Sequence, residues 1–332
     1  MITKPTVFVL GAGASVPYGF PTGAELRLSI CKNFHNKLSG IRSSVAYIKN
    51  HEPDELETQC NNFTKAFMNS GNSSIDLFLS RRREFYDLGK MAIVMEILEA
   101  EKASNFCEDS RIPEQDWYSY LFNRMTEDIR KSEDWTSIIN NQVHFITFNY
   151  DRSLEYFLFQ CIYNSFSLQE SDWGKLRNVL RNIHISHVYG QIFKLVWELE
   201  TDGRVPVEQY LGYGRAYDFE TIQESIKNIF TIYEERELIK KTGIREKMFE
   251  AERIFFLGFG FAPENMEILG IPASINPNTE VYGTSFGLKG GEINRIMDMF
   301  DGGRKEGKRV GPDKERVILK SSSCLDLLRE YL

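Results

Sequence analysis

Short apolar runs that end in glycine or in a polar cluster recur along this chain, and they constrain its fold more than any other feature. The first of them, Val7-Phe8-Val9-Leu10, is continuously apolar, which is typical of a strand buried on both faces of a parallel sheet. The four runs are residues 7–10 before Gly11, 143–148 before Asn149, 183–189 before Gly190 and 253–257 before Gly258. We expect their glycine or polar ends to meet at one edge of the sheet, where α/β proteins bind ligands.

Segments with helical periodicity separate these runs. Thr22 is a candidate N-cap, and Glu25 three residues later completes a capping-box spacing. Two further short strands are expected at 280–284 and 316–319. The main helices are predicted over residues 22–38, 74–103, 117–125 and 153–163. This alternation predicts an α/β fold, a Rossmann-like parallel sheet with helices on both faces.

Two long segments interrupt the strand pattern. Between residues 40 and 135 the strand signals disappear, and charged amphipathic stretches take their place. Residues 195–252 are likewise charged and mainly helical. A length of 332 residues suits one large domain. We therefore predict a single domain over residues 1–332 that carries two helical insertions.

Charge and cysteine usage limit the classes of partner and cofactor. The net charge is −7, with 40 basic and 47 acidic residues, so we expect no direct nucleic-acid binding. Cys31, Cys60, Cys107, Cys161 and Cys324 are scattered, with no C-x-x-C pair. This pattern argues against a disulfide framework and a zinc ribbon, and it suits a metal-free cytoplasmic protein. No apolar run is long enough to span a membrane.

The glycine-rich opening stretch allows three interpretations. A signal peptide is disfavoured, because the apolar run before Gly11 has only four residues. A structural turn and a phosphate-binding loop both remain open. In the second case the backbone of Gly11, Ala12, Gly13 and Ser15 would approach a pyrophosphate. Val16 stands at the third glycine position of the dehydrogenase fingerprint, so that motif is incomplete.

The later loops add polar side chains at the same predicted edge. Thr147, Asn149 and Asp151 end the second run, although Asn149 and Asp151 would also serve as helix caps. His187 lies close to Gly190 at the end of the third run. Asp76 opens a helix of the first insertion and is a further candidate if that insertion covers the cleft.

Taken in order, these loops resemble the sirtuin superfamily of NAD-binding proteins. The resemblance rests on GAGAS at 11–15, GFPTG at 19–23, TFNYD at 147–151, HVYG at 187–190, GFG at 258–260 and GTS at 283–285. The family histidine directly precedes glycine, whereas here Tyr189 does and His187 lies two residues earlier. Thr22 and Gly23 stand where the protein deacylases carry aspartate and phenylalanine. These departures make the chain similar to bacterial sirtuin-like effectors of anti-phage defence.

The resemblance implies that NAD+ is the substrate and that the protein hydrolyses it to nicotinamide and ADP-ribose. Asn149 would position the ribose or the attacking water, and His187 would be the general base. The implied binding residues are Gly11, Ala12, Gly13, Ser15, Pro21, Thr22, Thr147, Asp151, Gly190, Gly258, Gly260, Thr284 and Ser285. A homo-oligomer is expected, with a separate sensor or a HerA-type ring ATPase as partner. A deacylase, an ADP-ribosyltransferase and a non-catalytic NAD or ADP-ribose sensor are the alternatives.

Overall fold

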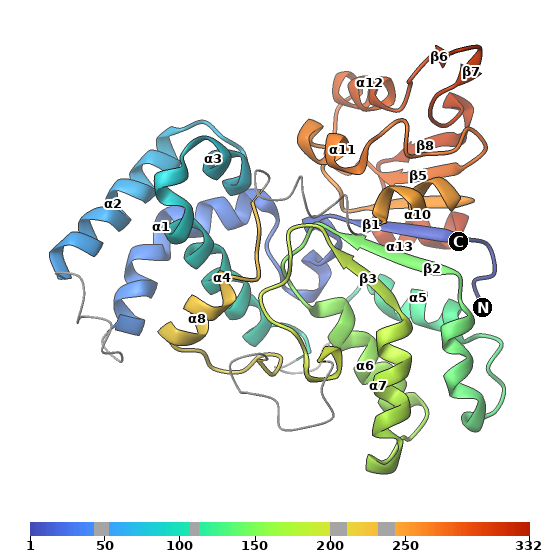
Figure 1. Ribbon diagram of the computed structural model, residues 1–332, viewed down its shortest axis with the longest axis horizontal. Helices are drawn as coiled ribbons and strands as arrows, with labels where there is room; N and C mark the ends of the chain where they lie inside the picture. The colour runs from blue at the N-terminus through green and yellow to red at the C-terminus, as the bar shows by residue number, and fades with distance from the viewer. Residues whose placement is uncertain (43–52, 107–112, 200–210, 232–242) are drawn as a thin grey trace.

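The computed structural model describes residues 1–42, 53–106, 113–199, 211–231 and 243–332. Its main sheet has six parallel strands in the order β3-β2-β1-β4-β5-β8 (Figure 1). The strands are β1 Thr6–Leu10, β2 Val143–Thr147, β3 His184–His187, β4 Arg253–Leu257, β5 Glu280–Thr284 and β8 Val317–Lys320. A separate antiparallel pair joins β6 Arg304–Lys305 to β7 Lys308–Arg309. The predicted Rossmann-like α/β fold is confirmed.

The apolar runs form the central strands for a simple reason. β1 pairs with β2 on one side and with β4 on the other, so its residues are covered in every direction. Phe8 is fully buried and stacks on Phe145 and Phe255, with ring centroids 5.2 and 5.4 Å apart. A strand enclosed in this way has no face that water reaches, which is why its sequence does not alternate.

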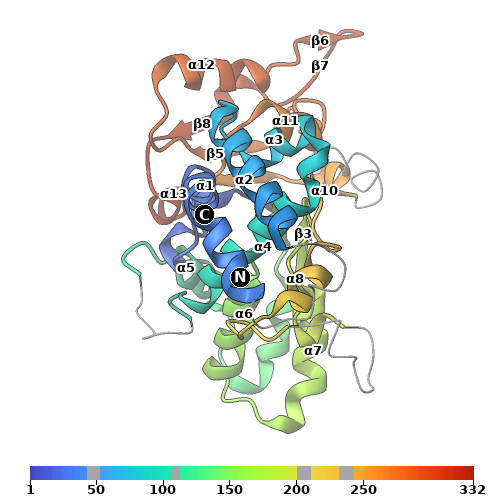
Figure 2. The same ribbon diagram turned by 90° about the vertical axis from the view of Figure 1, so that its left-hand side faces the viewer.

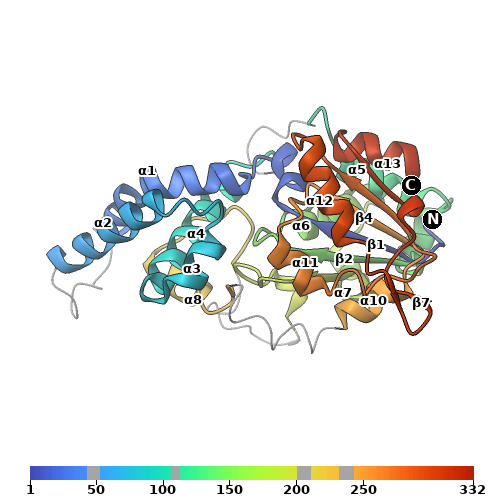
Figure 3. The same cartoon turned by 90° about the horizontal axis from the view of Figure 1, so that it is seen from above.

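Helices cover both faces of the sheet. α5 and α13 lie on one face, whereas α10 and α11 lie on the other (Figure 3). The helices of this part are α5 Trp117–Thr126, α6 Ser153–Ser165, α7 Trp173–Asn182, α10 Ile244–Glu250, α11 Pro263–Leu269, α12 Gly290–Met299 and α13 Cys324–Tyr331. Ser323 caps α13 by accepting from the N–H of Asp326.

A helical lobe lies beyond the carboxyl ends of the strands (Figures 1 and 2). It contains α1 Gly23–Arg42, α2 Pro53–Asn69, α3 Ile75–Arg81, α4 Tyr86–Lys102 and α8 Phe219–Ser225. α4 is buried along most of its length, since α1, α2, α3 and α8 all pack against it. The lobe thus combines α1, which begins before residue 40, with pieces of both predicted insertions. Residues 43–52 and 107–112 of the first insertion and 200–210 and 232–242 of the second lie outside the described residues.

The long helix predicted over residues 74–103 is wrong in one respect. α3 ends at Arg81, and α4 begins only at Tyr86 after a 3-10 turn. Arg82 leaves the helical region with φ −128° and ψ 72°. The break allows α3 to fold back on α4, where the absence of a side chain at Gly89 makes room for Leu79. A Cβ at Gly89 would lie 2.5 Å from a methyl carbon of Leu79.

One buried ion pair fastens the lobe to the sheet. Arg152, which directly precedes α6, donates to both carboxylate oxygens of Glu101 on α4, at 2.9 and 2.6 Å. It also donates to the carbonyl of Leu211 at 2.6 Å. The two side chains are 0% and 1% exposed. Because the pair is bidentate and enclosed, it fixes the position of α4 relative to the carboxyl end of β2.

None of the helices in the described ranges is both long and apolar enough to cross a membrane. Cys31, Cys161 and Cys324 are free thiols, and Cys107 lies outside the described residues.

Candidate functional site

The candidate site is the point where the strand order reverses. β1 lies between β2 and β4, so the chain leaves it toward one side first and returns later to the other. In open α/β sheets such a reversal opens a crevice outside the carboxyl ends of the strands. Here the Gly11 and Gly258 loops follow β1 and β4 directly, at the carboxyl ends of these strands.

The two glycine loops pack directly on each other. The N–H of Gly11 donates to the carbonyl of Leu257, and the N–H of Gly13 to that of Gly258, each at 3.0 Å. A Cβ at Gly11 would lie 2.5 Å from the Gly258 oxygen. A Cβ at Gly258, where φ is +56°, would lie 2.0 Å from the nitrogen of Ala14. These three glycines are therefore required by loop packing, and the two amides are already occupied.

Other backbone groups in the loops stay available. The N–H groups of Ala12 and Gly260 donate to no acceptor within the described part of the chain. Gly260 is exposed, and nothing lies within 4 Å of where its Cβ would stand. An anion at this edge would therefore meet Ala12 and Gly260 rather than Gly11 and Gly13.

A buried hydrogen-bonded chain lies beneath the first loop. Asn149 donates through Nδ2 to the carbonyl of Gly11 at 3.1 Å and to Oγ of Ser15 at 3.0 Å. Ser15 in turn donates to Oδ2 of Asp151 at 3.0 Å. All three polar side chains are buried. Asp151 thus orients Asn149 through Ser15, and the amide oxygen of Asn149 accepts no hydrogen bond from the described residues.

Asp151 also contacts the first residue of the helix that follows, α6. Its Oδ1 accepts from the N–H of Ser153 at 3.0 Å, at the first residue of α6, and from the Ser153 hydroxyl. Burial raises the pKa of the Asp151 carboxyl, the hydrogen bonds from Ser153 and Ser15 oppose that rise, and the negative Glu155 adds to it. Asp151 therefore accepts both from Ser15 and from the first residue of α6, while Arg152 occupies the N-cap position of that helix.

His187 is held between two acceptors. Its Nδ1 lies 3.1 Å from the carbonyl of Asn149, and its Nε2 lies 2.5 Å from Oε1 of Glu155. Burial lowers the pKa of His187, but Glu155, Glu198 and the carbonyl of Asn149 together outweigh it, so the net pKa is raised above its ordinary value. Because both partners accept, the imidazolium with a proton on each nitrogen satisfies the arrangement best. An imidazolium has no lone pair with which to act as a base.

The remaining predicted binding residues serve local contacts. Thr22 and Glu25 form the expected capping box at the start of α1, with N–H and hydroxyl contacts of 2.8 to 3.2 Å, and Pro21 precedes it. Oγ1 of Thr147 accepts from the N–H of Asn149, and Oγ1 of Thr284 accepts from the N–H of Gly258. These contacts fix the conformations of the loops after β2 and β4.

Gly190 and Ser285 differ from this group. A Cβ at Gly190, where φ is +72°, would lie 2.0 Å from the carbonyl oxygen of Asn228, because a strand-like bridge to Ile229 passes beside it. Ser285 is 1% exposed, and its hydroxyl makes no hydrogen bond with the described residues. Ser285 is therefore a buried donor at the carboxyl end of β5 that has no partner in this part of the protein.

Aromatic side chains from three loops meet at the same edge. Phe148 contacts the rings of Tyr189 and Phe259 at 5.6 and 5.1 Å, and Tyr150 stacks on Tyr189 at 6.1 Å. The Tyr189 hydroxyl donates to Oδ1 of Asn265 at 2.6 Å. In the sequence, Tyr189 stands out only as the residue that directly precedes Gly190. No local pattern distinguishes these aromatic residues from ordinary core residues.

The structure adds one acidic residue to this edge. The Tyr150 hydroxyl donates to Oδ1 of Asp76 at 2.5 Å. Asp76 belongs to α3 in the lobe, 74 positions before Tyr150 in the sequence. Asp76, a further candidate from the sequence if the first insertion covers the cleft, therefore reaches the loop that carries Asn149.

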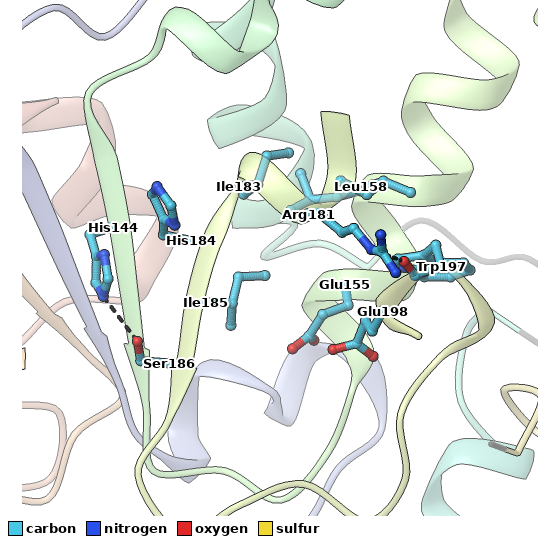
Figure 4. Close-up of a pocket in the computed structure, with 11 residues that line it drawn as sticks. His144, Glu155, Leu158, Arg181, Ile183, His184, Ile185, Ser186, Trp197 and Glu198 are labelled. Carbon is cyan, nitrogen blue, oxygen red and sulfur yellow. Dashed lines mark hydrogen bonds between the residues drawn. The ribbon is translucent and has the colours of Figure 1, made fainter. Parts of the chain in front are cut away.

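A cavity of about 380 Å³ lies at β3, and none of the residues that line it belongs to the glycine loops after β1 and β4. Figure 4 shows the Glu155 and Glu198 carboxylates side by side within it, and Ser186 bonded to His144. Burial and the neighbouring Glu155 raise the pKa of Glu198. Glu155 lines this cavity and also contacts His187.

Within the described residues, no three His, Cys, Asp or Glu side chains are arranged to hold a metal ion. Comparison of the chain with protein-family models and with curated proteins finds no match.

Proposed function

We propose that this protein hydrolyses NAD+ to nicotinamide and ADP-ribose at the β1–β4 crevice. The observation that carries the proposal is the Asp151–Ser15–Asn149 chain, which presents an oriented amide below a glycine loop at the reversal of the strand order. A ligand with a pyrophosphate and a ribose suits this edge. The N–H groups of Ala12 and Gly260 have no acceptor among the described residues and suit phosphate oxygens, and the amide oxygen of Asn149, which has no donor among them, suits a hydroxyl or a water.

The reaction breaks the bond between C1′ of the ribose and the nicotinamide nitrogen. The bonding electron pair moves to nicotinamide, which leaves neutral, and positive charge spreads over the sugar. Water then attacks C1′ and loses one proton. A preoriented amide oxygen stabilises such a charge because it does not reorganise during the reaction.

The proposal gives His187 a positioning role in place of the expected role as base. The imidazolium donates to the carbonyl of Asn149 and is held there by Glu155. It fixes the Asn149 backbone while Ser15 fixes the side chain. Nothing in this arrangement requires His187 to lose a proton.

The test is incubation of the purified full chain with NAD+ alone, followed by chromatography for nicotinamide and ADP-ribose. The wild type should form both without any acceptor. Asn149→Ala should reduce kcat by about 10²–10³, the cost of removing one oriented polar group. A reaction that needs an acyl-lysine peptide would indicate a deacylase, and tight NAD+ binding without product would indicate a sensor.

Asn141 provides the matched control. Asn141 and Asn149 are both 8% exposed, and each donates through Nδ2 to two oxygens. Asn141 instead accepts from the N–H of Ile2 and donates to the carbonyls of Met125 in α5 and Ile138. Asn141→Ala should lower the melting temperature but leave kcat unchanged. Equal activity of Asn149→Ala and wild type would overturn the proposed site.

The sequence resemblance further supports a role in anti-phage defence, in which an oligomer of this chain depletes cellular NAD+ together with a separate sensor or a ring ATPase. Light scattering on size-exclusion fractions, with NAD+ consumption assayed in the same fractions, tests the oligomer. Activity confined to a monomer peak would contradict it.

A further inference from the structure

We propose that Asp76, supplied by the helical lobe and held by Tyr150, is the group that accepts the proton of the attacking water. This inference rests on the proposed NAD+ hydrolysis. It assigns the step that His187 cannot perform while both of its nitrogens donate.

The position of Asp76 follows from two elements. Ser74 caps α3 by accepting from the N–H of Leu77, and this places Asp76 in the first turn of that helix. Tyr150 follows Asn149 directly and stacks on Tyr189, which fixes its ring. The 2.5 Å contact between Tyr150 and Asp76 therefore joins the lobe to the loop that holds the oriented amide.

The surroundings of Asp76 suit a base. The carboxyl is enclosed by protein, while the residue as a whole is half-buried. Oδ2 accepts no hydrogen bond from any other residue in the described ranges. Burial raises the pKa of Asp76, while the hydrogen bond from Tyr150 opposes that rise. A carboxylate with increased proton affinity is a stronger base near neutral pH.

The other titratable side chains near this edge already make hydrogen bonds that hold them in place. Both oxygens of Asp151 accept from serine hydroxyls or from the start of α6. His187 donates to Asn149 and Glu155. Tyr150 is the titratable side chain that contacts Asp76, and no charged side chain contributes to the shift of its pKa within the described residues.

The proposed step balances without a further reactant. As the C1′–nitrogen bond breaks, water adds to C1′ and its proton passes to Oδ2 of Asp76. Asp76 then releases that proton to solvent. The products are nicotinamide, ADP-ribose and one proton.

The test compares kcat and KM of the full chain with NAD+ for Asp76→Asn and wild type. Asp76→Asn should lose about 10²–10⁴ in kcat with little change in KM. Formate should restore part of the activity of Asp76→Ala, because it supplies a diffusible carboxylate. Tyr150→Phe keeps the ring but removes the donor that lowers the pKa of Asp76, so the acidic limb of its kcat profile should move to higher pH.

Asp116 is the matched control, because it also accepts from a tyrosine hydroxyl, Tyr18 at 3.0 Å, and caps a helix through Ser119. Asp116→Asn should retain wild-type kcat. Wild-type kcat in Asp76→Asn would overturn the role of Asp76 alone. Loss of activity with neither formate rescue nor a moved pH limb would show that Asp76 is only structural. A wild type that releases no nicotinamide would overturn the proposed function itself.

Discussion

The buried ion pair between Arg152 and Glu101 gives a prediction whose size follows from the structure. Arg152→Met keeps much of the side-chain volume but removes all three hydrogen bonds from the guanidinium. Glu101 is 1% exposed and would be left as an uncompensated buried charge. Breaking such a pair costs about 3–5 kcal/mol of folding free energy.

This loss of folding free energy corresponds to a decrease in melting temperature. An unfolding entropy of about 2.1 cal/mol/K per residue gives about 0.7 kcal/mol/K for this chain if it unfolds in one transition. Arg152→Met should therefore lower the melting temperature by about 4–7 °C. Thermal unfolding followed by circular dichroism at constant pH and salt measures it.

Two further variants separate the ion pair from side effects. The double variant Arg152→Met, Glu101→Leu removes both charges and should recover most of the lost stability, since a buried apolar pair is often as stable as the ion pair that it replaces. Lys247→Met breaks the exposed pair with Glu250, at 51% and 62% exposure, and should cost at most about 1 kcal/mol. A decrease for Arg152→Met no larger than that for Lys247→Met would refute the reasoning.

The packing glycines and the histidine pair give two more predictions. Gly258→Ala should lower the melting temperature by several degrees or prevent folding, because its Cβ would lie 2.0 Å from the Ala14 nitrogen and φ there is +56°. Gly260→Ala faces open space and should change the melting temperature little. Equal melting temperatures for the two variants would contradict the loop packing. The raised pKa of His187 means that its contribution to stability is fully present below its unfolded pKa of about 6.5 and is lost as pH rises through the folded value. The difference in melting temperature between wild type and His187→Gln should therefore shrink from pH 6 to pH 9, and a constant difference would show that the imidazolium–Glu155 pair does not form.

The sequence was a reliable guide wherever neighbouring residues decide the structure. The capping box of Thr22 and Glu25 spans three residues, and it forms as expected. The apolar runs become β1, β2 and β4 within about a residue of their expected bounds, because burial on both faces is recorded in each run separately. The break at Arg82 was missed, because the fold of α3 back onto α4 is decided by contact between two helices.

The same distinction between local pattern and tertiary contact applies to the candidate site. By itself, the sequence determined that glycine and polar loops gather at the carboxyl ends of parallel strands, since the alternation of apolar runs with helical segments predicts a parallel sheet. Only the tertiary structure decided what those residues do. In the folded chain Gly11 and Gly13 pack against Gly258, and His187 lies between two acceptors. Asp76 contacts Tyr150. Each of these contacts joins residues far apart in the chain, and the pattern within one segment carries no information about the partner that another segment supplies.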